Sequence, residues 1–204
     1  MILWLDAVLV VVLALAIDRY IGEVPNSIHP LRWMGNILAA IDRRVSCRGS
    51  KKAIAIGFLS YLLVFILFCG VGLFLTSLVR YGLSSAVSPL AGEVAWIILT
   101  ALLFKINFAI FSFRKHCDPI CDDLEAGRVE DAAAKVQMIV SRNTKGMDAE
   151  HIASSCCETV TENLVDSVYS PVLYFGILGL PGAVMFRCAN LMDAMWGYMN
   201  DKYA

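Results

Sequence analysis

The sequence predicts an all-α integral membrane protein with three transmembrane helices, a broken or re-entrant fourth apolar segment, and cytoplasmic amphipathic helices. Of its 204 residues, 58% are hydrophobic and 17% are charged, whereas average soluble proteins carry about 25% charge. The mean hydropathy is +0.67, and one stretch of 27 residues contains no charge. Since no tract is strongly basic, we expect no nucleic-acid partner.

Three apolar segments have the composition of membrane spans. Ala53–Val79 is the uncharged stretch, and about 20 apolar residues suffice to cross a bilayer. Ile2–Ile17 is shorter, but it lacks the basic region and the cleavage site of a signal peptide, so we expect a retained first span. Val94–Phe113 is the predicted third span, in which Lys105 and Asn107 should face a protein interior.

The loops between these spans predict the topology. Residues 18–52 contain seven Lys or Arg, whereas residues 80–92 contain one. Basic loops stay in the cytoplasm, so we expect residues 18–52 and 114–166 inside and residues 80–92 outside. Within the first loop, Pro30 begins a predicted amphipathic helix on the membrane surface, with an apolar stripe of Leu31, Met34, Ile37, Leu38, Ile41 and Val45. The protein would be a multi-pass cell-membrane protein with its active side in the cytoplasm.

Residues 114–166 are polar and have a helical pattern. Arg128–Ser141 places Val129, Ala132, Ala133, Val136 and Val140 on one stripe. Gly146 interrupts that pattern, and Asp148 is a predicted N-cap for the next helix, with Glu150 in its first turn.

The last apolar segment, Val168–Phe186, contains the turn-forming sequence LGLPGA. Each half is too short to span a bilayer, so a re-entrant hairpin and a broken fourth span are both open. We expect this turn to return the chain to the cytoplasmic side, with Tyr198 there.

The seven cysteines are scattered without a disulfide framework, which favours reduced thiols. The sequence HCDPIC (His116–Cys121) is a fragment of a metal site, but no second pair of ligands completes it.

Three carboxylates recur every fourth residue before the last apolar segment: Glu158, Glu162 and Asp166. On a helix they fan over about 80° of the circumference. No lysine alternates with them, and Asn163 adds a neutral oxygen ligand. A hard cation such as Mg²⁺ would relieve their repulsion. The alternative is a solvated helix face, or acids paired with Arg142, Lys145 or Arg114. Cationic groups for an anionic substrate lie in the same polar block: Arg114, His116, Arg142 and Lys145.

Several motifs follow one another in an order that resembles a known family. They are HPLRWMG near the start, SFRKH (112–116), VSRNT (140–144), ETVTENLVDS (158–167), SPVLYF, PGA and RCANLMDAMWGY (187–198). Together they resemble the adenosylcobinamide-phosphate synthases of cobalamin biosynthesis, which are integral membrane enzymes. Asn143 and Glu23 stand where that family usually has Asp. Family members continue well past Ala204, so we expect residues 1–204 to form a single membrane-embedded synthase domain without the C-terminal part usual in the family.

The resemblance implies a carbon–nitrogen ligase that uses ATP and Mg²⁺. The family joins adenosylcobyric acid, a corrinoid, to an aminopropanol phosphate through an amide bond. The implied partners are this corrinoid, the aminoalcohol phosphate, the lipid bilayer and other membrane enzymes of cobalamin assembly. A homo-oligomer is a further expectation.

Site roles follow from the resemblance and the residue types. Glu158, Glu162 and Asp166 are expected to bind Mg²⁺ or ATP. His116, Glu158 and Glu162 are the expected catalytic residues, and His116 would hold phosphate or accept a proton from the attacking amine. The expected substrate-binding or phosphate-binding residues are Arg114, Arg142, Thr144, Asn163, Asn190 and Asp193. Asn190 and Asp193 fit a helix-packing polar pair equally well, and His29 is expected to be a local cap.

Two other classes of protein stay open on the sequence. An intramembrane metal-dependent phosphotransferase or prenyltransferase also presents acids at helical spacing, though usually as paired Asp motifs. A non-catalytic transporter component would place its acids deep within spans, where Asp6, Glu93 and Lys105 are the nearest candidates.

Overall fold

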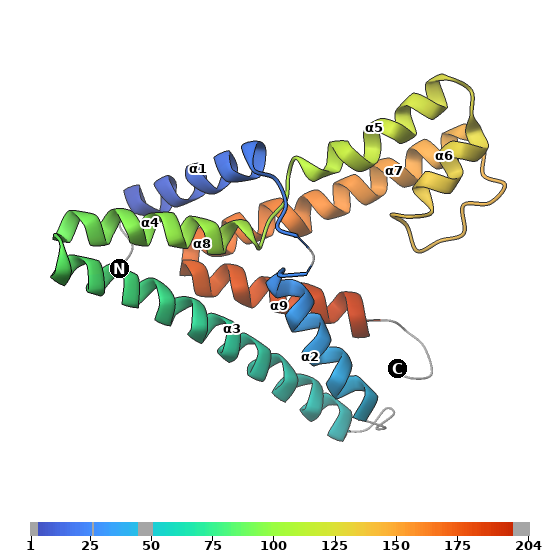
Figure 1. Cartoon of the computed structure of the whole chain (residues 1–204). Coiled ribbons are helices and arrows are strands. Elements are labelled where there is room, and N and C mark those ends of the chain that lie inside the picture. The colour runs from blue at the N-terminus through green and yellow to red at the C-terminus, as the bar shows by residue number, and fades with distance from the viewer. Residues whose placement is uncertain (1–3, 26, 45–50, 198–204) are drawn as a thin grey trace.

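The computed structural model describes residues 4–25, 27–44 and 51–197, and these residues form helices joined by loops (Figure 1). No strand occurs among them. The helices, in chain order, are α1 (Trp4–Tyr20), α2 (Pro30–Arg44), α3 (Lys51–Ala86), α4 (Pro89–Lys105), α5 (Ser112–Glu125), α6 (Val129–Val136), α7 (Ala149–Leu164), a π-helical segment (Val165–Tyr169), α8 (Ser170–Leu178) and α9 (Leu180–Trp196). The all-α prediction is confirmed.

The main core is a bundle of apolar helices. α4 packs against α1 and α3, and α9 packs against α3 and α8. Phe104 on α4 is fully buried at the centre, where its ring lies 5.0 Å from that of Phe108 and 4.3 Å from that of Phe175 on α8. These contacts join α4 to the hairpin formed by α8 and α9, so the last apolar segment belongs to the same core as the first helices.

In the described part of the chain, one helix, α3, is long and apolar enough to cross a membrane. Many of its large side chains are exposed, among them Ile54, Phe58, Leu59, Leu63, Ile66, Phe74 and Leu78. An apolar surface of this extent fits contact with lipid. α1 and α4 have 17 residues each, and the count of three spans stays a prediction.

The predicted boundaries of the third span, 94–113, are wrong. α4 begins at Pro89, where the Ser88 hydroxyl accepts a hydrogen bond from the Ala91 amide at 3.2 Å, and it ends at Lys105. The Asn107 side chain donates to the Leu103 carbonyl at 2.9 Å, which satisfies a carbonyl left free at the helix end. Apolar composition continues beyond Lys105, but residues 106–111 form turns and irregular backbone instead of a helix.

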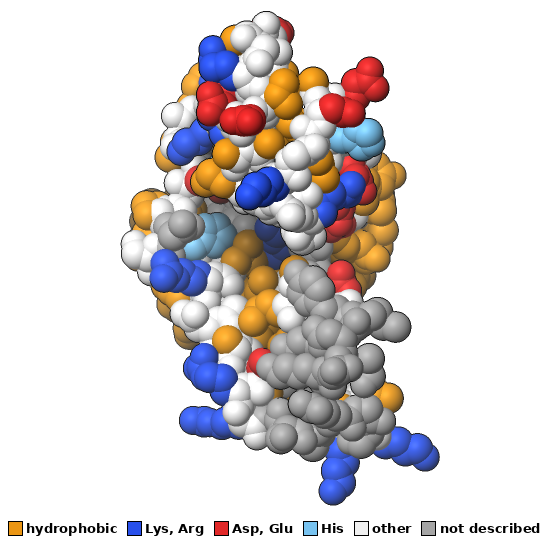
Figure 2. Space-filling model, turned by 90° about the vertical axis from the view of Figure 1, so that its right-hand side faces the viewer, with side chains coloured by type: hydrophobic (Ala, Val, Ile, Leu, Met, Phe, Trp, Pro, Cys, Tyr) orange, Lys and Arg blue, Asp and Glu red, His pale blue; other side chains and the backbone are white. Residues whose placement is uncertain are grey.

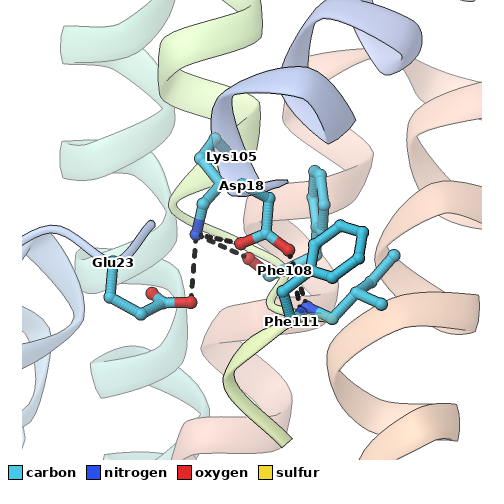
Figure 3. Close-up of polar contacts among 6 residues, drawn as sticks. Asp18, Glu23, Lys105, Phe108 and Phe111 are labelled. Atoms are coloured by element: carbon cyan, nitrogen blue, oxygen red, sulfur yellow. Dashed lines mark hydrogen bonds and ion pairs between the residues drawn. The ribbon is translucent and has the colours of Figure 1, made fainter. Parts of the chain in front are cut away.

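Lys105 and Asn107 are both buried, as the sequence predicts. The Lys105 ammonium lies 2.8 Å from an Asp18 carboxylate oxygen and 3.2 Å from Glu23, and it donates to the Phe108 carbonyl at 3.3 Å (Figure 3). The other Asp18 oxygen accepts from the backbone amides of Ile110 and Phe111, at 2.9 and 3.2 Å. One ion pair therefore connects the end of α1, the end of α4 and the segment that leads to α5.

The amphipathic helix predicted from Pro30 is present as α2, but its apolar stripe is covered by protein. Met34 and Leu38 are buried in the main core, and α2 packs on α9 and α3. The stripe therefore packs on protein, and the expected position of α2 on the membrane surface stays a prediction. Val45 lies outside the described residues. The His29 ring accepts a hydrogen bond from the Leu31 amide at 3.2 Å, so His29 caps α2 as expected.

A smaller core lies in an arm made of α5, α6 and the first half of α7, which extends away from the bundle in Figure 1. The predicted helix over 128–141 is shorter than expected, because α6 ends at Val136 and turns follow. Asp148 caps α7 by accepting from the His151 amide at 2.9 Å, as predicted. This capping contact holds the pKa of Asp148 below its usual range.

The last apolar segment turns at Gly179, within the sequence LGLPGA. Gly179 has a φ of 68°, which favours glycine, and α8 and α9 pack together on either side of it. The rings of Tyr174 and Phe186 stack across this hairpin at 5.3 Å. The helix is therefore interrupted where the sequence predicts a turn. The position of the hairpin in a bilayer stays a prediction, and Tyr198 lies outside the described residues.

Candidate active-site pocket

A pocket of about 390 Å³ lies where the arm meets the bundle. Its walls come from α7, the π-helical segment, α9 and the segment 139–142, and Leu31 of α2 also lines it. Figure 2 looks onto this side of the molecule and shows a hollow between its upper and lower parts, with charged side chains near the rim. The volume is in the range of small-molecule sites.

The carboxylate stripe faces this pocket. Glu158, Glu162 and Asp166 all line it, together with Asn163. The sequence places these residues on one side of a helix. In the structure, Arg142 and Arg187 from other elements line the same pocket. The Glu158 side chain is 56% exposed, and Glu162 is exposed as well, so the role of the stripe stays a prediction.

Each of the three carboxylates has a different surrounding. Glu158 forms an ion pair with Arg142, which comes from the loop before α7. Asp166 accepts a hydrogen bond from the Asn190 amide nitrogen at 2.8 Å. Glu162 has no side-chain partner in the ranges that the structure describes. Its carboxylate is thus the one of the three that has neither an ion pair nor a side-chain hydrogen bond.

Asp166 and Ser167 lie in the π-helical segment between α7 and α8. A π turn contains an extra residue, so it rotates the following side chains relative to an α-helix, and such segments are frequent at functional sites. The Ser167 carbonyl accepts a hydrogen bond from the Ala109 amide at 3.0 Å. The widened turn is therefore anchored to the segment that follows α4, next to the Lys105 and Asp18 ion pair.

Arg187 is a pocket residue that the sequence analysis missed. It lies on α9, and its Nη1 donates to Asn190 Oδ1 at 3.1 Å and to Ser167 Oγ at 3.4 Å. The available signal was an arginine directly after an apolar segment, because a charge at such a place usually faces a polar interior. Arg142 and Asn190, by contrast, are predicted site residues that do line the pocket.

Four expected site residues do not line the pocket. Arg114 is 80% exposed on α5 and pairs with Asp118 at 3.6 Å, and His116 is exposed on the same helix. Asp193 is exposed on α9. Thr144 is buried for a structural reason, because its hydroxyl donates to the Ala133 carbonyl at 2.8 Å. Thr144 and Asp193 share a loop or helix with pocket residues, whereas α5, which contains Arg114 and His116, contributes no residue to the pocket.

The structure has free thiols at all six cysteines that it describes. Burial, followed by a contact with Cys117, raises the pKa of the Cys156 thiol to about 12, so it is protonated at neutral pH. No group of three His, Cys, Asp or Glu side chains is arranged to hold a metal ion in the described ranges. The HCDPIC segment accordingly contributes packing residues, with Ile120 and Cys117 in the core of the arm.

Comparison with known proteins identifies the family. The family model described as CobD/Cbib protein matches residues 11–204. A probable cobalamin biosynthesis protein CobD of Thermococcus kodakarensis is 42% identical over 192 residues, which cover 94% of this chain and 59% of the relative. Proteins of the same name are 36% identical in Pyrococcus abyssi, over 94% of this chain and 60% of the relative, and 30% identical in Methanocaldococcus jannaschii, over 96% and 62%.

The chain thus spans about three fifths of the length of these curated relatives. No solved structure matches it. The matched residues include every element that lines the pocket, from α2 to α9. On this match the chain belongs to the CobD/Cbib family.

Proposed function

We propose that this chain carries the site of an ATP-dependent amide-forming enzyme of cobalamin biosynthesis. In this reaction the amine of an aminopropanol phosphate displaces a carboxyl oxygen of adenosylcobyric acid, that oxygen leaves on a phosphate group derived from ATP, and adenosylcobinamide phosphate is formed. The names of the relatives support a role in cobalamin biosynthesis. The observation that carries the proposal is the pocket that groups Glu158, Glu162 and Asp166 with Arg142 and Arg187.

The pocket residues suit a Mg²⁺–ATP complex. Mg²⁺ keeps several waters and needs only one or two protein carboxylates beside substrate phosphates. A cage of three ligands is therefore not required. Glu162 is the open carboxylate, and Glu158 or Asp166 would be the second ligand. When bound, the metal neutralises phosphate charge during activation of the corrinoid carboxyl group.

Arg142 would bind phosphate at the mouth of the pocket. Its guanidinium pairs with Glu158 across the gap between the 139–142 segment and α7. Both side chains are half exposed, so this pair contributes little stability and can exchange for a ligand. Arg114, His116, Thr144 and Asp193 lie outside the pocket and have no role in the proposed site.

The direct test is an assay on the purified chain in detergent or vesicles. Adenosylcobyric acid, aminopropanol phosphate, ATP and Mg²⁺ are supplied, and adenosylcobinamide phosphate is measured by chromatography. We expect product only when all four are present. Thermal stabilisation by a polyprenyl diphosphate, without any by a corrinoid, would favour a prenyltransferase instead.

We also propose that α5, α6 and the start of α7 lie in the cytoplasm. The reason is that residues 18–52 contain seven Lys or Arg whereas residues 80–92 contain one, and basic loops stay in the cytoplasm. Lys51 and Ser85 are exposed near the two ends of α3. In intact cells lacking other reactive cysteines, we expect Ser85→Cys to react with an impermeant maleimide and Lys51→Cys to be protected. The reverse pattern would overturn this topology.

A further inference from the structure

Arg187 is a half-buried cation whose hydrogen-bond partners are both neutral. Its Nη1 donates to Asn190 Oδ1 and to Ser167 Oγ. A guanidinium has five N–H donors, and those on Nε and Nη2 have no partner in the parts of the chain that the structure describes. No described carboxylate forms an ion pair with Arg187, although the pocket contains three. The side chain thus offers unused donors within the pocket.

Asn190 explains why Arg187 and Asp166 do not pair directly. Its amide nitrogen donates to Asp166 Oδ2 at 2.8 Å, while its amide oxygen accepts from Arg187 Nη1 at 3.1 Å. Only one orientation of the amide satisfies both neighbours. Asn190 therefore holds a cation and an anion at its two ends and leaves each of them with free hydrogen-bonding capacity.

The remaining charges of the pocket are already in use or lie elsewhere. Arg142 is paired with Glu158, and Glu162 is the open carboxylate assigned to the metal. Asp166 and Glu23 attract the Arg187 guanidinium electrostatically but do not form an ion pair with it. Burying a guanidinium without a directly paired anion is costly, which favours an anion supplied by a ligand. The planar fork of arginine suits a phosphate or a carboxylate, which it binds through two parallel hydrogen bonds.

One of the proposed substrates has both an anionic group, which would complement Arg187, and a cationic group, which would complement Asp166. An aminopropanol phosphate has a phosphate monoester and an ammonium group on neighbouring carbons. Nucleotide phosphates are a poorer match for Arg187, because the metal neutralises them. A corrinoid carboxyl group would match Arg187 but would leave Asp166 without a cation.

We infer that Arg187, Asn190 and Asp166 form the subsite for the aminoalcohol phosphate. Arg187 binds the phosphate, Asp166 contacts the ammonium group, and Asn190 is the positioning residue between them. This inference rests on the proposed function and assigns the second metal carboxylate to Glu158, since Asp166 is then occupied by substrate.

Isothermal titration of the purified chain in detergent tests the subsite without turnover. The ligands are aminopropanol phosphate, isopropyl phosphate, which lacks the amine, and aminopropanol, which lacks the phosphate. We expect the first to bind tightest. Arg187→Gln should weaken binding of both phosphate compounds by at least about tenfold, because it removes a charged hydrogen-bonding group. Asp166→Asn should instead abolish the preference for the compound with the amine. Arg43→Gln, at the exposed end of α2, is the matched control and should bind like the wild type.

Three outcomes separate this inference from the proposed function. If the wild type makes product but Arg187→Gln, with an unchanged melting temperature, keeps wild-type affinity for aminopropanol phosphate, the subsite is wrong and the function stands. If Arg187→Gln does not fold, Asp166→Asn decides, and an unchanged preference for the amine overturns the inference. If the wild type neither binds aminopropanol phosphate nor makes product, the proposed function itself fails.

Discussion

Glu162→Gln is expected to remove most of the formation of adenosylcobinamide phosphate while leaving the fold intact. Glu162 lines the pocket and is exposed, with no side-chain partner in the described residues, so the amide replacement breaks no contact there. It keeps the size of the side chain but removes the charge that a hard cation requires. We expect activity to fall by about 10²-fold or more, the scale for losing one electrostatic group in an active site.

The measurement is the rate of product formation at several Mg²⁺ concentrations, with the melting temperature in detergent as a check on folding. A role in metal binding also predicts that the variant needs more Mg²⁺ for half of its maximal rate. Glu130→Gln is the control, because Glu130 is an exposed acid on α6 outside the pocket. Normal activity of a folded Glu162→Gln protein at ordinary Mg²⁺ would mean that the stripe has no catalytic role.

Lys105→Met is expected to have the largest effect on stability. The Lys105 and Asp18 side chains are 2% and 1% exposed, and their ion pair is 2.8 Å long. Without the ammonium group, Asp18 would be a buried charge balanced only by two backbone amides. Breaking such a pair by removing one partner costs about 3–5 kcal/mol. Chemical unfolding in mild detergent, followed by tryptophan fluorescence, measures the change in the free energy of unfolding.

A double-mutant cycle separates the ion pair from simple packing. Asp18→Asn combined with Lys105→Met leaves no buried charge, so we expect the double variant to be more stable than Lys105→Met alone. Lys52→Met is the control, since Lys52 is exposed at the start of α3. A Lys105→Met protein as stable as the Lys52→Met protein would show that the pair contributes nothing to the fold.

Local signals in the sequence were sufficient for much of the helical framework. The uncharged stretch from Ala53 predicts α3, Pro30 predicts the start of α2, and the N-cap Asp148 predicts the start of α7. The glycines and prolines of LGLPGA predict the turn at Gly179. These features depend on interactions within a few residues, such as an N-cap hydrogen bond or a positive φ, so they can be recognised without the fold.

Boundaries that depend on long-range contacts were harder to predict. The third apolar segment continues to residue 113 in composition, but its helix ends at Lys105, where the side chain is held by Asp18 from α1. The apolar stripe of α2 suggests a membrane surface, but α9 and α3 cover it. In both cases an element distant in the sequence contacts residues for which the local pattern predicts contact with the membrane.

For the site, the sequence by itself determined that Glu158, Glu162 and Asp166 share one side of a helix, because helical periodicity relates side chains on the same element. Only the tertiary structure decided what lies opposite them. It brings Arg187 and Asn190 of α9 to Asp166, and it leaves His116 exposed outside the pocket. Helical periodicity does not reveal which face of another helix packs nearby. That packing depends on the burial of the whole apolar core, and on the turn at Gly179 that folds α9 back along α8.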